Sequence, residues 1–160
     1  MADQHLAHIN VARFRLPKRD VVNAGFLAEL DAVNAAAESG DGLLWRFTAA
    51  GADAADRRIA EDDHTLANLS VWSDVEALKL FTYRDPLHRA MMRRRREWFE
   101  RLDVSLALWW VPAGTRPRLR DGMERLALLA RLGPTPESFT FAKPFDGDGR
   151  LAVAPGRDAA

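Results

Sequence analysis

The order of strand-like and helix-like segments limits this chain to few folds. Alternation of side chains indicates a strand at residues 5–14, and an apolar period near that of a helix indicates a helix at 21–37. The remaining expected elements are strands at 43–48 and 66–72, two helices within 74–101, a strand at 104–111, a helix opened by Pro117 and closed by Gly133-Pro134, and a short strand at 138–142. This β-α-β-β-α-β order predicts a ferredoxin-like α+β fold with a four-stranded antiparallel sheet and an extra C-terminal helix.

Local signals set the expected boundaries of these elements. Asp20 is a candidate N-cap, and the pair Ser73 and Glu76 has the spacing of a capping box, which predicts a helix from Asp74. Asp85 followed by proline predicts a second start, with a break near Arg84. Residues 49–63 are expected to form a loop. We expect one domain at 5–145 and a partly ordered tail at 146–160.

Composition removes several classes of function. The 160 residues include 23 basic and 23 acidic side chains, so the zero net charge gives no electrostatic argument for nucleic acid or membrane partners and permits self-association. The chain has no cysteine, which excludes disulfides and thiolate chemistry. The first ten residues lack the pattern of a signal peptide, and no apolar run is long enough to span a bilayer. We therefore expect a cytoplasmic protein.

The two long strands each divide into an apolar set and a mixed set. Alternate residues of a strand face opposite sides, so the purely apolar sets are expected under the helices. The apolar sets are Ala7, Ile9 and Val11, and Ala67, Leu69 and Val71. The mixed sets are expected on the other, open face, and they comprise Leu6, His8, Asn10, Ala12 and Phe14, and Leu66, Asn68, Ser70 and Trp72. Such a mixture suits a ligand pocket beside a homodimer interface, although an interface alone or a solvated face also remains open.

Tryptophans supply candidate walls for this pocket. Trp45 shares one side of its strand with Phe47, and that side is taken to face the pocket. Trp109 and Trp110 point in opposite directions, and Trp109 is assigned to the pocket. Both assignments place an aromatic ring beside the polar side chains of the mixed face.

The segment 86–102 resembles a basic, nucleic-acid-binding run, but its helical wheel argues against that. His88 and Arg95 fall within an apolar arc, while most arginines lie outside it as a solvated face. Arg95 is expected either in a site or in a buried pair with an acid such as Glu29, and His88 either in a site or bonded to a carbonyl. The first turn of a helix disfavours imidazolium, so His88 is predicted to be neutral at pH 7.

Four segments together resemble a known family. They are NLSVW (68–72), FTYRDPLHRAMMRRRREWF (81–99), LWWVPAG (108–114) and GPTPESFTF (133–141). They are similar to an uncharacterised bacterial family of domains of unknown function in the dimeric α/β-barrel superfamily. The resemblance implies a ferredoxin-like fold and a homodimer formed through the open sheet face.

More distant relatives suggest a chemistry. Asn68 and Trp72 match an Asn-x-x-x-Trp strand motif of antibiotic-biosynthesis monooxygenases. This resemblance implies an enzyme that positions an aromatic substrate and dioxygen without a cofactor. Haem-degrading monooxygenases have an Asn, a Trp and a helix His that ligates iron, but His88 follows Trp72 at a longer spacing than in that family. We expect that the protein uses no cofactor, and haem ligated by His88 is the alternative.

The expected function is binding of a small planar or aromatic molecule by a monooxygenase-like enzyme, with a non-catalytic sensor as the alternative. Motifs for dinucleotides, nucleotide phosphates, serine hydrolysis or zinc proteases do not occur, and no metal site is expected. The candidate catalytic residues are His88, Asn68 and Arg95. The candidate ligand-binding residues are His8, Asn10, Trp45, Ser70, Trp72, Tyr83, Met92, Phe99 and Trp109.

Overall fold

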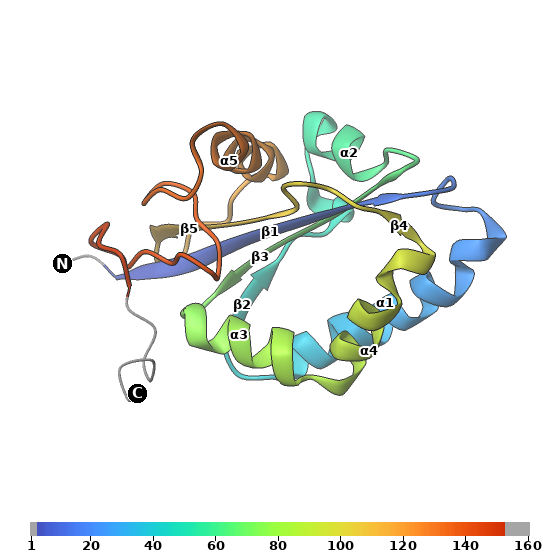
Figure 1. Cartoon of the computed structure of the whole chain (residues 1–160), viewed down its shortest axis with the longest axis horizontal. Helices are drawn as coiled ribbons and strands as arrows, with labels where there is room; N and C mark the ends of the chain where they lie inside the picture. The colour runs from blue at the N-terminus through green and yellow to red at the C-terminus, as the bar shows by residue number, and fades with distance from the viewer. Residues whose placement is uncertain (1–2, 153–160) are drawn as a thin grey trace.

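A computed structural model describes residues 3–152 and shows one antiparallel sheet (Figure 1). Its strands are β1 (Gln4–Phe14), β2 (Leu43–Arg46), β3 (Thr65–Trp72), β4 (Phe99–Glu100) and β5 (Leu106–Pro112). They run in the order β2-β3-β1, and the free edge of β1 pairs with β5 along its first part and with β4 at its end. The protein is therefore a mixed α+β structure built around the long strand β1.

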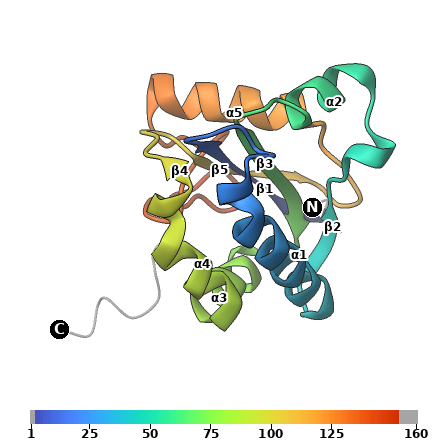
Figure 2. The same cartoon turned by 90° about the vertical axis from the view of Figure 1, so that its right-hand side faces the viewer.

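Helices cover both faces of this sheet. The helices are α1 (Ala24–Ser39), α2 (Ala54–Ala60), α3 (Val75–Arg84), α4 (Pro86–Arg94) and α5 (Leu119–Leu132). Figures 1 and 2 show α2 and α5 on one side, with α1, α3 and α4 on the other. None of the helices within residues 3–152 is both long enough and apolar enough to cross a bilayer.

The division of β1 and β3 into two side-chain sets is confirmed, but the predicted open face is wrong. Ala7 and Leu69 of the apolar sets pack in a core with Leu126 of α5, whereas Leu6 and Trp72 of the mixed sets pack with Leu78 of α3. Both faces are covered because the chain has two groups of amphipathic helices and each must bury an apolar side. The mixed face therefore lies under α1, α3 and α4.

Most helix boundaries follow the predicted caps. Asp85 accepts a hydrogen bond from the His88 amide and α4 starts at Pro86, so the break between two helices is confirmed. The cap of α3 differs from the prediction by one residue. Asp74 rather than Ser73 caps this helix, by accepting a hydrogen bond from the Ala77 amide. A carboxylate is a stronger acceptor than a hydroxyl for the free amides of a first turn.

Two local expectations are wrong. Residues 49–63 are not simply a loop, because Asp53 accepts from the Asp56 amide and starts α2. The second of the two helices expected within 74–101 ends as α4 at Arg94, and a 3-10 turn at Arg95–Glu97 leads into β4. Pairing with β1 overrides helical propensity here: the Arg15 amide donates to the Trp98 carbonyl at 2.8 Å, and β4 continues the ladder.

Candidate functional site

Four polar side chains form a block at the centre of the mixed face. Strand register sets His8 opposite Ser70 and Asn10 opposite Asn68. Residues directly opposite each other in an antiparallel pair point to the same side, as do residues two apart along one strand. The structure thus brings together these four predicted site residues, which we call the polar block.

A chain of hydrogen bonds runs across the polar block. The Trp72 indole Nε1 donates to Ser70 Oγ at 2.9 Å, and Ser70 Oγ lies 3.2 Å from Nδ1 of His8. Trp72 is 4% exposed and Ser70 is 8% exposed, so neither group exchanges freely with bulk water. These hydrogen bonds give the indole N–H the acceptor that a buried tryptophan requires.

Asn10 and Asn68 differ from their neighbours in the block. Both are half-buried, and neither carboxamide makes a side-chain hydrogen bond to any other group of residues 3–152. A primary amide offers two donors and one carbonyl acceptor. The pair therefore leaves free hydrogen-bonding capacity at a partly covered position on the sheet.

The electrostatic setting of the block keeps His8 neutral. Burial lowers the pKa of His8 to about 4, and the nearby charge of His88 adds to the effect in the same direction. Loss of hydration penalises the imidazolium form, and a second imidazolium would repel it. His8 therefore presents a neutral imidazole at physiological pH.

His88 reaches the same region from the first turn of α4. Its Nδ1 lies 2.9 Å from the Thr82 carbonyl of α3, and burial lowers its pKa against the opposing effects of that hydrogen bond and of the Asp85 charge. The direction of this shift agrees with the predicted neutral state, although its main cause is burial rather than the helix dipole. The carbonyl-bonded arrangement, one of the two alternatives for His88, is observed.

Aromatic rings separate His88 from the indole of Trp72. The ring centroid of Phe81 is 5.6 Å from that of Trp72 in a stacked arrangement and 5.3 Å from that of His88. Phe81 thus fills the space beside both rings. The polar block therefore lies next to a packed aromatic group contributed by β3, α3 and α4.

The other predicted pocket tryptophans lie elsewhere. Trp45 packs with the core beneath α5, and Trp109 is buried in that same core, so both are on the face opposite His8. Trp110 is the tryptophan of β5 on the His8 side, where its Nε1 donates to the Phe145 carbonyl at 2.8 Å. Parity alone could not decide this, because it fixes opposite directions for neighbours without fixing which is which.

The basic segment also departs from its predicted wheel. Arg95 is exposed on the 3-10 turn because α4 ends before it, and Arg94 makes the ion pair with Glu29 at 3.3 Å instead. Met92 is 43% exposed and Tyr83 is 58% exposed, so neither belongs to a buried lining. Phe99 packs edge-on against Phe26 and belongs to the core.

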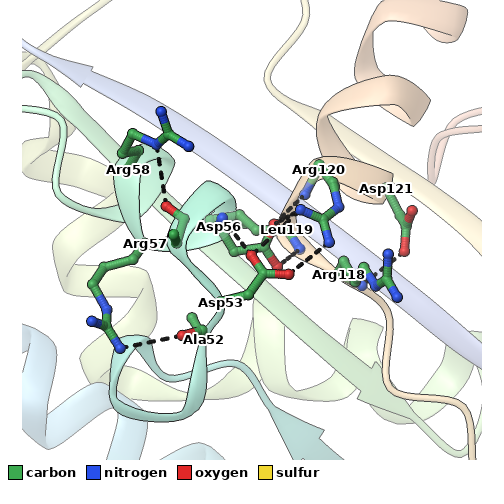
Figure 3. Close-up of polar contacts among 10 residues, drawn as sticks. Ala52, Asp53, Asp56, Arg57, Arg58, Arg118, Leu119, Arg120 and Asp121 are labelled. Atoms are coloured by element: carbon green, nitrogen blue, oxygen red, sulfur yellow. Dashed lines mark hydrogen bonds and ion pairs between the residues drawn. The ribbon is translucent and has the colours of Figure 1, made fainter.

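A second polar cluster, which the sequence analysis missed, ties α2 to α5 (Figure 3). The Asp56 carboxylate is 4% exposed and accepts hydrogen bonds from the Leu119 amide at 2.9 Å and the Arg120 amide at 3.2 Å. The Arg120 guanidinium pairs with Asp53 at 2.6 Å. The available signal was Asp53 followed three residues later by Asp56, which is a helix start inside the supposed loop.

This second cluster holds the fold together on the face away from the polar block. Asp56 supplies the acceptors that the first amides of α5 lack within their own helix. No group of three or more His, Asp or Glu side chains in the described part of the chain is arranged to hold a metal ion. The carboxylates of the second cluster are committed to helix capping and to Arg120, so the polar block is the better candidate for a functional site.

Solved structures that are similar to this chain include three at low identity. PA3566 from Pseudomonas aeruginosa is 14% identical, with a TM-score of 0.48 over 72% of this chain and 99% of that one. The protein of unknown function NE2512 from Nitrosomonas europaea is 10% identical, with a TM-score of 0.47 over 73% and 96%. Rv0793 from Mycobacterium tuberculosis is 17% identical, with a TM-score of 0.47 over 70% and 97%.

No curated protein matches the chain. A family model described as "Domain of unknown function (DUF3291)" matches residues 5–154, which is nearly the whole sequence. The expected resemblance to a family of unknown function is thereby confirmed, and the chain belongs to the DUF3291 family.

Proposed function

We propose that the polar block binds a small planar organic molecule, and that the protein is a monooxygenase-like enzyme acting on it without a cofactor. The observation that supports this most is the facing pair Asn10 and Asn68, whose half-buried amides lack protein partners. Neither amide is among the fully buried, unpartnered polar atoms of the described residues, so both amides reach solvent and are free to form hydrogen bonds with a ligand.

The surroundings favour a flat, aromatic ligand. Trp72 and Phe81 stack on each other next to the block, so a ligand beside the two amides would meet an aromatic, apolar neighbourhood. Apolar walls with a few directed polar groups are the usual composition of a small-molecule site.

His88 is the proposed general base. Because its Nδ1 is bonded to the Thr82 carbonyl, its Nε2 carries the free lone pair, and its neutral state keeps that lone pair available. It would take a proton from an activated CH2 between two rings, and Asn68 would stabilise the resulting enolate oxygen. Dioxygen then gives one atom to a new carbonyl and one to water, and the CH2 group supplies the four electrons and both hydrogens. Arg95, exposed on its turn, has no part in this proposal.

We also propose a ferredoxin-like arrangement and a homodimer. The antiparallel order β2-β3-β1-β5 with α1, α3 and α4 on one face supports the first. Because helices cover both faces of the sheet, including the mixed face that was predicted to be open, a dimer would use another surface than the one predicted. A cytoplasmic location remains part of this proposal.

Two alternatives receive different support. A non-catalytic sensor would use the same polar block, so only turnover separates it from an enzyme. Haem on His88 receives less support, because its two carboxylates would need cations, and Arg46, the charged neighbour of the polar block, is already paired with Glu38.

The test uses anthrone, a flat ketone with an activated CH2, as the probe. We expect anthrone to raise the melting temperature of the protein and to be oxidised to anthraquinone faster than in buffer, with one dioxygen consumed per product. Asn68→Leu should remove both effects, and His88→Gln should remove turnover.

Thr65→Val is the matched control, since it changes a polar side chain of the same strand on the opposite parity. Stabilisation by anthrone without turnover would support the sensor alternative. No stabilisation, or equal stabilisation of Asn68→Leu, would remove the proposed site.

A further inference from the structure

The partners of Ser70 define the hydrogen positions within the polar block. An indole Nε1 can only donate, so the oxygen of Ser70 accepts from Trp72. The hydroxyl hydrogen of this buried serine then needs an acceptor, and Nδ1 of His8 lies within reach at 3.2 Å. A neutral imidazole that accepts at Nδ1 carries its hydrogen on Nε2.

His88 has the opposite assignment for an independent reason. A carbonyl oxygen can only accept, so Nδ1 of His88 carries the hydrogen that it donates to Thr82. Its Nε2 is therefore an acceptor. The two imidazoles are close enough for the charge of one to affect the pKa of the other.

We propose that Ser70 and Thr82 fix His8 as a hydrogen-bond donor and His88 as an acceptor, so that the site selects neutral ligands carrying both an acceptor and a donor over anions. This inference rests on the proposed binding function and narrows its ligand class. Ser70 is a positioning residue in it, since it acts through His8. The ligand class is that of neutral aromatic amides, phenols and hydroxy-ketones.

Charge in the neighbourhood supports the choice of neutral ligands. The polar block contains no ionised side chain when His8 is neutral. The charged neighbour across from Ser70 is Arg46 of β2, and its Nε and NH2 groups both donate to Glu38 at 3.0 and 2.9 Å. An anion bound at the block would lack an uncommitted cation, and burying an unpaired charge is costly.

The first experiment reads the tautomers directly by 15N NMR of the imidazoles near pH 7. We expect His8 to be protonated at Nε2 and His88 at Nδ1. Ser70→Ala should change the nitrogen shifts of His8 and leave those of His88, whereas Ser70→Thr should preserve both. Ser39→Ala, an exposed serine on α1, is the control. The same tautomer at both histidines, or no response to Ser70→Ala, would overturn the proposed assignment.

The second experiment compares 2-naphthamide with 2-naphthoate, which share a shape and differ in charge. The amide is expected to bind at least about tenfold more tightly, because it offers a donor and an acceptor without a charge to bury. Ser70→Ala should narrow this ratio and Ser70→Thr should restore it.

The outcomes separate the two proposals. Equal or tighter binding of the naphthoate would refute selection of neutral ligands while leaving the binding site standing. If neither probe binds and the tautomers are as assigned, the proposed binding function fails and the ligand class fails with it.

Discussion

The two faces of one sheet are covered equally well but are built from different chemistry. Under α5 the sheet buries apolar side chains such as Ile9 and Leu69, and Asp56, the buried acidic residue within residues 3–152, caps a helix there. Under α1, α3 and α4 the same strands present the polar block. The same paired strands therefore form a stabilising apolar interface on one face and present polar groups without protein partners on the other.

This difference teaches that burial and satisfaction are separate properties. A polar group adds little to stability when it is satisfied and costs stability when it is not. The α5 face gains from every side chain it buries, whereas Asn10 and Asn68 gain nothing from the protein alone. The amides of Asn10 and Asn68 therefore remain available for hydrogen bonds to another molecule.

Truncation on the α5 face is expected to have the largest effect. Ile9 is fully buried and packs near Gly122 of α5, so Ile9→Ala should lower the free energy of unfolding by about 3–4 kcal/mol. Urea denaturation followed by tryptophan fluorescence measures it. A loss below about 1 kcal/mol would show that α5 is loosely docked and that the two faces are not different in this way.

The second-largest effect is expected from acid, which should lower the stability of the fold through the mixed face. The pKa of His8 is lowered to about 4 in the folded protein, so below an ordinary value near 6.5 the unfolded chain binds the proton first. The contribution of neutral His8 to the free energy of unfolding is complete above about pH 6.5. The free energy of unfolding should fall by about 2–3 kcal/mol as the pH drops to 4. The lowered pKa of His88 acts in the same direction.

The matched variant for this pH effect is His8→Asn, which keeps an acceptor near Ser70 and removes the titration. Chemical denaturation at several pH values between 7 and 4.5 should show a shallower slope for the variant than for the wild type. Parallel slopes would mean that His8 is not buried as a neutral group.

The cap of α5 should rank third. Asp56→Ala removes the carboxylate that accepts from the Leu119 and Arg120 amides, and the expected loss is about 2 kcal/mol. Asp56→Asn keeps one acceptor oxygen and should lose less. Thermal unfolding compares the two, and an equal loss in both would mean that the charge rather than the hydrogen bonds does the stabilising.

The smallest stability effect is expected in the polar block itself. Asn68→Leu replaces a half-buried amide that has no protein partner with an apolar side chain of similar size, so stability should change by less than about 1 kcal/mol in either direction. The same denaturation assay measures it. A loss comparable to that of Ile9→Ala would show that the amide is structural, and the contrast between the faces would disappear.

Local sequence signals predicted the elements well where one residue type decides the outcome. Asp85 with Pro86 fixed the start of α4, and the alternation along β1 separated the two side-chain sets correctly. Residues of the polar block were all among the predicted ligand-binding or catalytic positions. The end of α4 could not be predicted, since it depends on backbone pairing of Trp98 with Arg15, far away in the chain.

By itself, the sequence determined which side chains of β1 and β3 share a face, because a strand has a period of two wherever it lies. Only the tertiary structure decided which layer covers each face, whether Trp109 or Trp110 joins His8, and that Asp56 caps a helix 63 residues later. Those outcomes depend on competition between helices for the two sides of one sheet. That competition is a property of the packed chain, and no single segment contains it.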